Sequence, residues 1–206
     1  MSETLLKVDN LGITFGGLKA VQKVNMYLNR GELVGLIGPN GAGKTTMFNM
    51  LTGVYAPTEG SIVFGGKSIA GLDPYKVTRQ GISRTFQNIR LFKELSVLDN
   101  VKVANHGLAK HNLLSSIFRL PSHFKGEAKM EEESLAFLKI FGLDVYKDEL
   151  AKNLPYGMQR RLEIARALAA GPKLLLLDEP AAGMNPQETH DLMELIAFIR
   201  KEFNLT

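Results

Sequence analysis

The chain has 206 residues, 45% of them hydrophobic, which is enough for one sizeable core or for a core with a smaller subdomain. It contains no cysteine, so disulfides and thiolate metal sites are excluded. The formal net charge of +4 comes from scattered basic residues, which does not indicate a nucleic-acid surface but leaves contact with an anionic membrane surface or a phosphate ligand open. The N-terminal sequence MSETLLKVDN lacks the basic start and apolar run of an export signal, and no stretch approaches the roughly 18 apolar residues of a spanning helix.

The first strong motif lies in residues 33–53, LVGLIGPNGAGKTTMFNMLTG. The apolar run Leu33–Ile37 predicts a short buried strand, and Thr45–Leu51 predicts a helix that ends at Gly53. Between them, GPNGAGKT fits the pattern G-x-x-x-x-G-K-[ST] without departure. In such a loop successive backbone N–H groups face a phosphate, Lys44 reaches the outer phosphates, and the Thr45 hydroxyl can bind Mg²⁺. The residues that we expect to bind a nucleotide here are Gly38, Asn40, Gly41, Gly43, Lys44, Thr45 and Thr46.

The middle of the chain predicts mostly helix. Gln87 follows a strand-like stretch, and Ser96–Asp99 has the pattern of a capping box that opens a helix. Residues 131–143, EEESLAFLKIFGL, carry apolar side chains at helical spacing and are closed by Gly142. Residues 106–129 are less regular, and we interpret them as an exposed helix and loop, with contact to a membrane partner as the lesser alternative. The four histidines share no ligand spacing, so a histidine metal site is not predicted.

Residues 154–168, LPYGMQRRLEIARAL, allow two interpretations. One is a turn followed by a solvated basic helix. The other is a helix N-terminus with Gly157 placed where a phosphate must come close.

A second strong motif is PKLLLLDEPAAGMNP, residues 172–186. The leucine run predicts a strand buried on both faces, whose carboxyl end delivers Asp178 and Glu179 to a site. Together with a phosphate loop, these carboxylates could hold Mg²⁺ and activate an attacking water, respectively. Further on, Asn185 and Pro186 have the pattern of a helix cap and first turn.

Taken in order, the phosphate loop, Gln87, the helix start near Gly157 and the Asp178–Glu179 pair resemble the ATP-binding subunit of an ABC transporter over essentially the whole chain. This resemblance implies an α/β fold, a P-loop nucleotide-hydrolase core of the ABC ATPase type with an inserted helical subdomain. The core would comprise residues 1–86 and 154–206, and the helical subdomain would comprise residues 87–153.

The resemblance also implies roles for single residues. Glu179, Gln87 and Lys44 would be catalytic, and ATP and Mg²⁺ would be the cofactors. Mg²⁺ would be held by Thr45, Gln87 and Asp178. Phe15 falls where the family stacks an aromatic ring on adenine, and a core phenylalanine is an equally good interpretation. Leu154 and Gly157 belong to the signature sequence, which in this family meets the ATP bound by a second subunit.

The signature departs from the family's usual Leu-Ser-Gly-Gly-Gln, because Pro155, Tyr156 and Met158 replace the serine, a glycine and the glutamine. Asn185 stands where the family usually has aspartate. We therefore expect a weaker signature contact from this chain and a heterodimer with a second ABC ATPase subunit.

The combination of FGGLKAV, RTFQNIRLFKELSVLDNV and the motifs above is similar to the ATPases of branched-chain amino acid importers. That resemblance implies integral membrane permease subunits, an indirect link to an extracytoplasmic solute-binding protein, no nucleic-acid partner, and a peripheral position at the cytoplasmic face of the inner membrane. Importers of other small solutes such as urea or amides, a soluble non-transport ABC ATPase and a phosphate-loop kinase are the alternatives.

The end of the sequence predicts an amphipathic helix whose apolar face carries Leu192, Leu195, Ile196, Ile199 and Phe203. In the family this helix leads to a further strand and a histidine-bearing loop, and no histidine follows His190. We therefore expect the C-terminal part of the core to be truncated, and this form to be poorly stable alone and deficient in hydrolysis.

Overall fold

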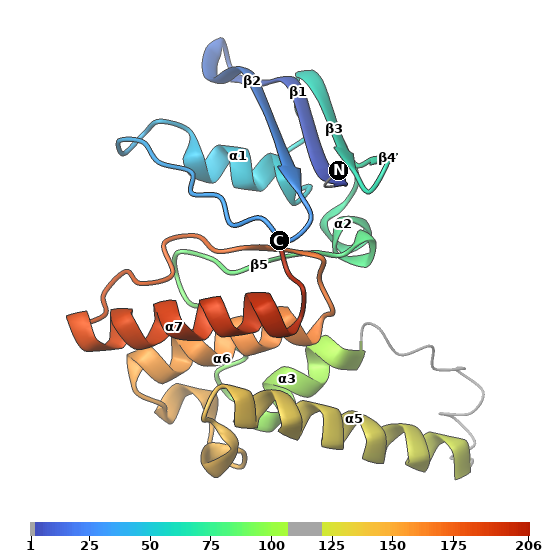
Figure 1. Cartoon of the computed structure of the whole chain (residues 1–206), viewed down its shortest axis with the longest axis vertical. Helices are drawn as coiled ribbons and strands as arrows, with labels where there is room; N and C mark the ends of the chain where they lie inside the picture. The colour runs from blue at the N-terminus through green and yellow to red at the C-terminus, as the bar shows by residue number, and fades with distance from the viewer. Residues whose placement is uncertain (1–2, 107–120) are drawn as a thin grey trace. The chain divides into compact units, whose positions relative to one another are not determined.

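The computed structural model describes residues 3–106 and 121–206 (Figure 1). Of residues 106–129, for which an exposed helix and loop are predicted, residues 107–120 lie outside this range. Contacts divide the described chain into two compact units. The first contains the residues up to Arg84, Lys173–Asp178 and Ile196–Thr206, and the second contains Thr85–Pro172 and Glu179–Leu195.

The first unit is built on an antiparallel sheet with the strand order β2-β1-β3-β4. Its strands are β1 (Thr4–Phe15), β2 (Leu18–Asn29), β3 (Glu59–Phe64) and β4 (Lys67–Ser68). A second, parallel pair joins β5 (Ile82–Arg84) to β6 (Leu174–Leu176). The helices of this unit are α1 (Lys44–Leu51) and α2 (Pro74–Gln80).

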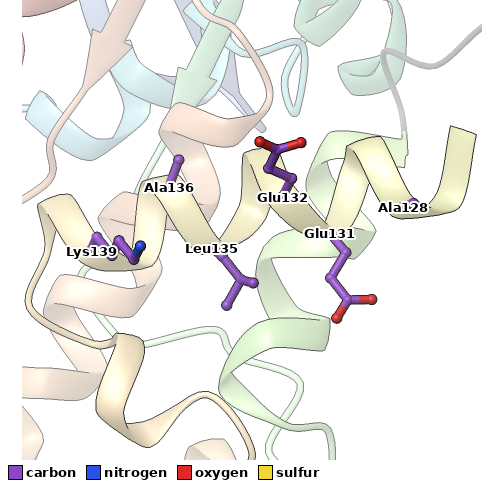
Figure 2. Close-up of a pocket in the computed structure, with 6 residues that line it drawn as sticks. All are labelled: Ala128, Glu131, Glu132, Leu135, Ala136 and Lys139. Carbon is purple, nitrogen blue, oxygen red and sulfur yellow. The ribbon is translucent and has the colours of Figure 1, made fainter. Parts of the chain in front are cut away.

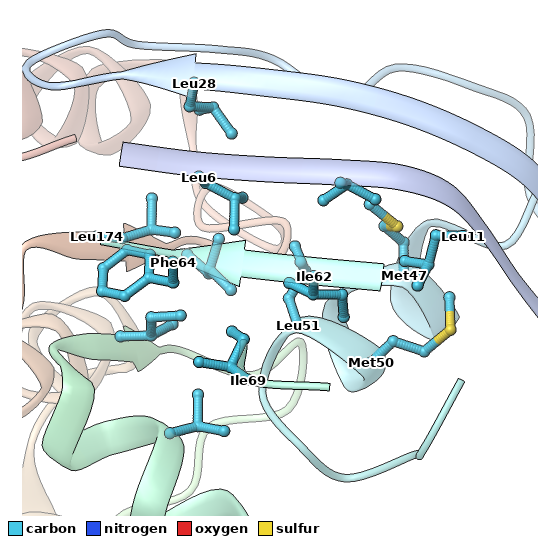
Figure 3. Close-up of a cluster of buried hydrophobic side chains, with 14 of the residues drawn as sticks. Leu6, Leu11, Leu28, Met47, Met50, Leu51, Ile62, Phe64, Ile69 and Leu174 are labelled. Carbon is cyan, nitrogen blue, oxygen red and sulfur yellow. The ribbon is translucent and has the colours of Figure 1, made fainter. Parts of the chain in front are cut away.

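The core of the first unit lies between the sheet and α1 (Figure 3). Leu6 and Val8 are buried at alternate positions of β1, as are Leu11 and Ile13, and the pairing of β1 with β2 shifts register between Val8 and Leu11. Ile62 of β3 is fully buried in the same core. Met50 of α1 and Leu174 of β6 complete the same cluster. The core therefore fixes the helix that follows the predicted phosphate loop.

The second unit is mainly helical, as predicted for the middle of the chain. Its helices are α3 (Val97–His106), α5 (Pro121–Ile140), η1 (Asp144–Tyr146), η2 (Ala151–Asn153) and α6 (Tyr156–Ala169), and α7 (Pro186–Glu202) begins in it and ends in the first unit. The α3 helix packs against both α5 and α6. None of the described helices is both long enough and apolar enough to cross a membrane.

Both predicted helix caps are confirmed. The Ser96 hydroxyl accepts a hydrogen bond from the Asp99 N–H at 3.0 Å and donates to the Asp99 carboxylate at 2.7 Å, just before α3. At the start of α7, Asn185 Oδ1 accepts from the Glu188 N–H at 2.9 Å, and Glu188 Oε2 accepts from the Asn185 N–H at 3.0 Å. Each pair satisfies backbone groups that have no partner within the helix.

The predicted strand Leu33–Ile37 is wrong. Among the described residues no strand pairs with this segment, and Leu33 and Ile37 are 64% and 94% exposed. An apolar run can form a strand only where a neighbouring strand offers backbone partners. Two residues before Leu33, the Gly31 backbone N–H donates to the Thr206 hydroxyl at 2.9 Å.

Candidate nucleotide-binding and hydrolysis site

The predicted phosphate loop runs directly into α1. Gly43 takes the N-cap position with φ +85°, and a Cβ there would lie 2.9 Å from the carbonyl oxygen of Ala20. Glycine is therefore required at this position both by the backbone conformation and by the close approach of β2. The Lys44 ammonium donates to the carbonyl oxygens of Gly38 at 2.6 Å and Pro39 at 2.9 Å. The loop thus folds around the Lys44 side chain, at the junction of loop and helix that the sequence pattern predicts.

Two oxygen donors suited to Mg²⁺ belong to the same unit. Thr45 is exposed in the first turn of α1, and Asp178 follows β6. Mg²⁺ prefers hard oxygen ligands and usually binds through one or two carboxylates together with substrate phosphates and water. The described residues contain no cluster of three or more His, Cys, Asp or Glu side chains that could hold a metal ion. A hydroxyl and a single carboxylate in the unit that contains the phosphate loop therefore fit Mg²⁺ that arrives with a nucleotide.

Asp178 is paired with an arginine that no local sequence pattern indicates. Its carboxylate accepts a hydrogen bond from Arg84 Nη2 at 2.8 Å, and the two side chains are 4% and 8% exposed, Arg84 being the less exposed. The other guanidinium nitrogen, Nη1, donates to Asn49 Oδ1 on α1 at 2.6 Å. Asp178 is thus buried and paired with an arginine.

Phe15 lies at the end of β1 and is 42% exposed, so the interpretation of Phe15 as a core residue is wrong. Its ring meets the ring of Tyr55 edge to face, with centroids 5.2 Å apart and planes at 73°. The exposed part of the Phe15 ring is accessible to a planar ligand.

In the second unit, the structure brings Gln87 and Glu179 together although they are 92 positions apart in the sequence. Gln87 Nε2 donates to Glu179 Oε2 at 3.1 Å, and both side chains are exposed. Glu179 has φ +47°, a left-handed conformation that is uncommon for residues other than glycine and is concentrated at functional sites. The pair therefore presents an accessible carboxylate that is oriented by an amide.

The backbone beside Gln87 is held by a buried ion pair on α6. Arg160 and Glu163 have side chains that are 0% and 1% exposed and lie 2.7 Å apart. Arg160 donates to the carbonyl oxygens of Phe86 at 2.7 Å and Gln87 at 2.8 Å. Glu163 Oε1 accepts from the N–H groups of Phe86 at 3.4 Å and Arg90 at 3.1 Å. The spacing of Arg160 and Glu163 in the sequence predicts a helical pair, but their burial could not be seen there.

The signature segment begins α6, and that helix is not solvated, so the interpretation as a solvated basic helix is wrong. Its buried residues are Gly157, Arg160, Leu162, Glu163, Ile164, Ala165, Leu168 and Ala169. Leu154 is buried and caps η2, while Pro155 precedes α6 without a side-chain cap. A Cβ at Gly157 would lie 2.9 Å from Glu188 Oε1, so only glycine fits without movement.

A small hollow adjoins this helix start, lined by Phe141, Gly142, Leu143, Pro155, Gly157, Met158, Arg161, Met184 and Glu188. The substituted Tyr156 donates its hydroxyl to the Ala182 carbonyl at 3.0 Å. Pro155 and Met158, which depart from the family's usual signature, thus line the hollow. Tyr156, the third such residue, is hydrogen-bonded to the segment that follows Glu179.

A shallow hollow on α5 carries no comparable chemistry. It is lined by Ala128, Glu131, Glu132, Leu135, Ala136 and Lys139, all from one helix (Figure 2). Glu131 forms a long ion pair of 3.9 Å with Lys102. We assign no catalytic or metal site to these residues.

Comparison with known proteins agrees with this geometry. Residues 21–182 match the ABC transporter family. The chain is 47% identical over 206 residues to the high-affinity branched-chain amino acid transport ATP-binding protein BraF of Pseudomonas aeruginosa. The alignment covers 100% of this chain and 81% of BraF. LivG of Escherichia coli K12, which carries the same description, matches with the same identity and coverage.

Among solved structures, the ADP conformation of MJ1267, an ATP-binding cassette of an ABC transporter, aligns with a TM-score of 0.82. Its sequence is 30% identical, and the alignment covers 98% of this chain and 78% of that chain. The predicted α/β fold of the ABC ATPase type is therefore confirmed. The chain belongs to the ABC transporter family, as one of its nucleotide-binding ATPase cassettes.

Proposed function

We propose that this cassette binds and hydrolyses ATP to drive an importer of branched-chain amino acids. The observation that carries the proposal is the 47% identity with BraF and LivG, which extends over the whole chain. The arrangement of side chains supports it, because the phosphate loop, the buried Asp178 and the Gln87–Glu179 pair supply the groups that nucleotide hydrolysis needs.

The first unit would bind the nucleotide. The backbone N–H groups at Gly38, Asn40, Gly41 and Gly43 and at the start of α1 would cradle the phosphates, with Thr46 beside Thr45 in the first turn. Lys44 would exchange its two carbonyl partners for phosphate oxygens, and Phe15 would stack on adenine. Thr45, Asp178 and Gln87 would hold Mg²⁺, which when bound neutralises charge that develops on the phosphates.

Glu179 would take the proton from the attacking water. Its carboxylate is accessible and already accepts a hydrogen bond from Gln87, so the amide can orient it without neutralising it. We further propose that residues 1–86 and 154–206 act as the nucleotide core and residues 87–153 as the helical subdomain.

The partners would be integral membrane permease subunits, a second ABC ATPase subunit and, indirectly, an extracytoplasmic solute-binding protein, with no nucleic acid. The cassette would sit at the cytoplasmic face of the inner membrane, held by the permeases. Leu154 and Gly157 would face the ATP of the second subunit. Because Pro155 brings no hydroxyl to that contact, we propose a heterodimer whose other subunit has the usual signature.

Replacement of Lys44 by alanine is expected to weaken ATP binding by about 10- to 100-fold, because hydrogen bonds to charged groups contribute roughly 1.5 to 3 kcal/mol. Equilibrium binding of a fluorescent ATP analogue measures the effect. Lys67→Ala is a matched control, since it removes the same charge from an exposed position of the same unit. Unchanged affinity in Lys44→Ala would contradict the assignment of the phosphate loop.

The combined variant Pro155→Ser, Tyr156→Gly and Met158→Gln restores the usual signature. In the working complex it is expected to change ATP turnover only modestly, because the other composite site would carry most of the hydrolysis. Native mass spectrometry of the assembled transporter gives the subunit composition. An active homodimer of this chain with two equal sites would contradict the proposed asymmetry.

The proposed function is tested by purification of the cassette from native membranes and identification of the chains that accompany it. Integral membrane permease subunits are the expected result. A tight complex with nucleic acid and no membrane subunit would instead indicate a non-transport ATPase.

A further inference from the structure

Arg84 ends β5 and reaches two other elements of the first unit. Its Nη2 donates to Asp178 Oδ2 at 2.8 Å, and its Nη1 donates to Asn49 Oδ1 on α1 at 2.6 Å. Its guanidinium also lies over the ring of Phe48, 5.5 Å from the centroid. Arg84 therefore links the carboxylate after β6 to the helix whose first turn carries Thr45.

The Arg84–Asp178 pair is buried, so each side chain depends on the other for its counter-charge. With the Arg84 and Asp178 side chains only 4% and 8% exposed, water cannot serve as the main partner of the carboxylate. A buried carboxylate needs a counter-charge, and loss of one member of such a pair leaves the other uncompensated. The guanidinium supplies a positive charge to the same carboxylate that Mg²⁺ would use.

We propose that Arg84 is an internal counter-ion that competes with Mg²⁺ for the Asp178 carboxylate. This inference rests on the proposed function, in which Asp178 helps to hold Mg²⁺ together with a nucleotide. If Mg²⁺ takes Oδ2, the Arg84–Asp178 hydrogen bond must lengthen or break, and if it takes Oδ1, the neighbouring guanidinium still repels it, so in both cases the affinity for Mg²⁺ is reduced. Asn49 and Phe48 give the released guanidinium a place to remain, because both contacts are independent of Asp178.

Removal of the competing charge should make Mg²⁺ bind more tightly. For Arg84→Met, the Mg²⁺ concentration that gives half of the full thermal stabilisation by ADP is expected to fall about tenfold, the order expected for the loss of one charge-assisted hydrogen bond. Without Mg²⁺ the same variant should melt at a lower temperature than the wild type, because Asp178 then lacks its partner.

The experiment uses the full chain with saturating ADP and records the melting temperature from EDTA through increasing Mg²⁺. Arg30→Met is the control, because it removes an arginine–carboxylate pair of the same unit, with Glu3, that is largely exposed. Its Mg²⁺ midpoint should match the wild type. Arg84→Lys keeps the positive charge but cannot donate to Asn49 and Asp178 through two separate nitrogens, so its Mg²⁺ midpoint should fall only a few-fold. This variant serves as the test if Arg84→Met does not fold.

An unchanged or higher Mg²⁺ midpoint in both Arg84 variants would overturn the inference and leave Arg84 as a structural residue. Weaker binding of ADP in EDTA to a folded Arg84→Met protein would also overturn it, because Arg84 would then contact the phosphates itself. A wild-type protein that shows no stabilisation by ADP with Mg²⁺ would contradict the proposed function, a result distinct from an unshifted midpoint.

Discussion

Glu179→Gln is expected to lower ATP turnover by about 10²- to 10⁴-fold while ATP binding is retained, the usual contribution of a general base. The substitution keeps the shape of the side chain and removes the proton acceptor. Gln87 Nε2 can still donate to the remaining carbonyl oxygen at the position of Glu179 Oε2, so the local geometry should persist. The bound ATP should therefore accumulate without hydrolysis.

Phosphate release from the complex with its membrane partners, and ATP retained on the protein, measure this effect. Glu194→Gln is a matched control, because Glu194 is also exposed in the second unit and its carboxylate lies 3.3 Å from His190 Nε2. It should keep the wild-type rate. Full turnover by Glu179→Gln would remove Glu179 from the mechanism.

Arg160→Met is expected to lower the free energy of unfolding by about 3 to 5 kcal/mol, because it leaves Glu163 buried without its counter-charge. Such a loss is a large part of the roughly 5 to 15 kcal/mol that stabilises a typical domain. The variant also removes the donors to the carbonyl oxygens of Phe86 and Gln87. The segment that carries Gln87 should consequently loosen together with α6.

Urea denaturation monitored by circular dichroism measures the change. The neighbouring variant Arg161→Met is the control, since its side chain is 31% exposed and its pair with Asp191 is long, at 3.5 Å. It should cost less than about 1 kcal/mol. The double variant Arg160→Met, Glu163→Leu should recover only part of the loss, because the backbone groups of Phe86, Gln87 and Arg90 still lack their side-chain partners.

A cost below about 1 kcal/mol for Arg160→Met would show that the buried pair does not stabilise the second unit. Full recovery of the free energy of unfolding in the double variant would show that the loss in Arg160→Met comes only from the unpaired charge of Glu163. The backbone beside Gln87 would then be held by other contacts.

The features that could be predicted from the sequence are those encoded by neighbouring residues. The phosphate loop before α1 and the caps at Ser96 and Asn185 depend on side chains within a few positions of one another, and the structure has them as predicted. The Gln87–Glu179 contact is long-range, and it was accessible only because the resemblance to a known family assigned both residues to one site.

The features that could not be predicted depend on partners far away in the chain. Arg84 and Asp178 are 94 positions apart, and nothing near Arg84 distinguishes it from a surface arginine. The apolar run Leu33–Ile37 predicts a buried strand, but an apolar pattern does not show whether a neighbouring strand is present to pair with it. The burial of Arg160 could not be predicted either. Arginine is rarely buried unless it is paired, and the backbone partners of Arg160 at Phe86 and Gln87 are distant in the sequence.

The most direct test of the proposed function is transport by the reconstituted complex. The cassette is combined with the membrane subunits that co-purify with it, placed in vesicles with ATP and Mg²⁺, and supplied with labelled leucine, isoleucine or valine and the matching solute-binding protein. Uptake that requires ATP and is lost in Glu179→Gln is the predicted result. ATP turnover by an intact complex without uptake of any of these amino acids, or with uptake of urea or an amide instead, would contradict the proposed function.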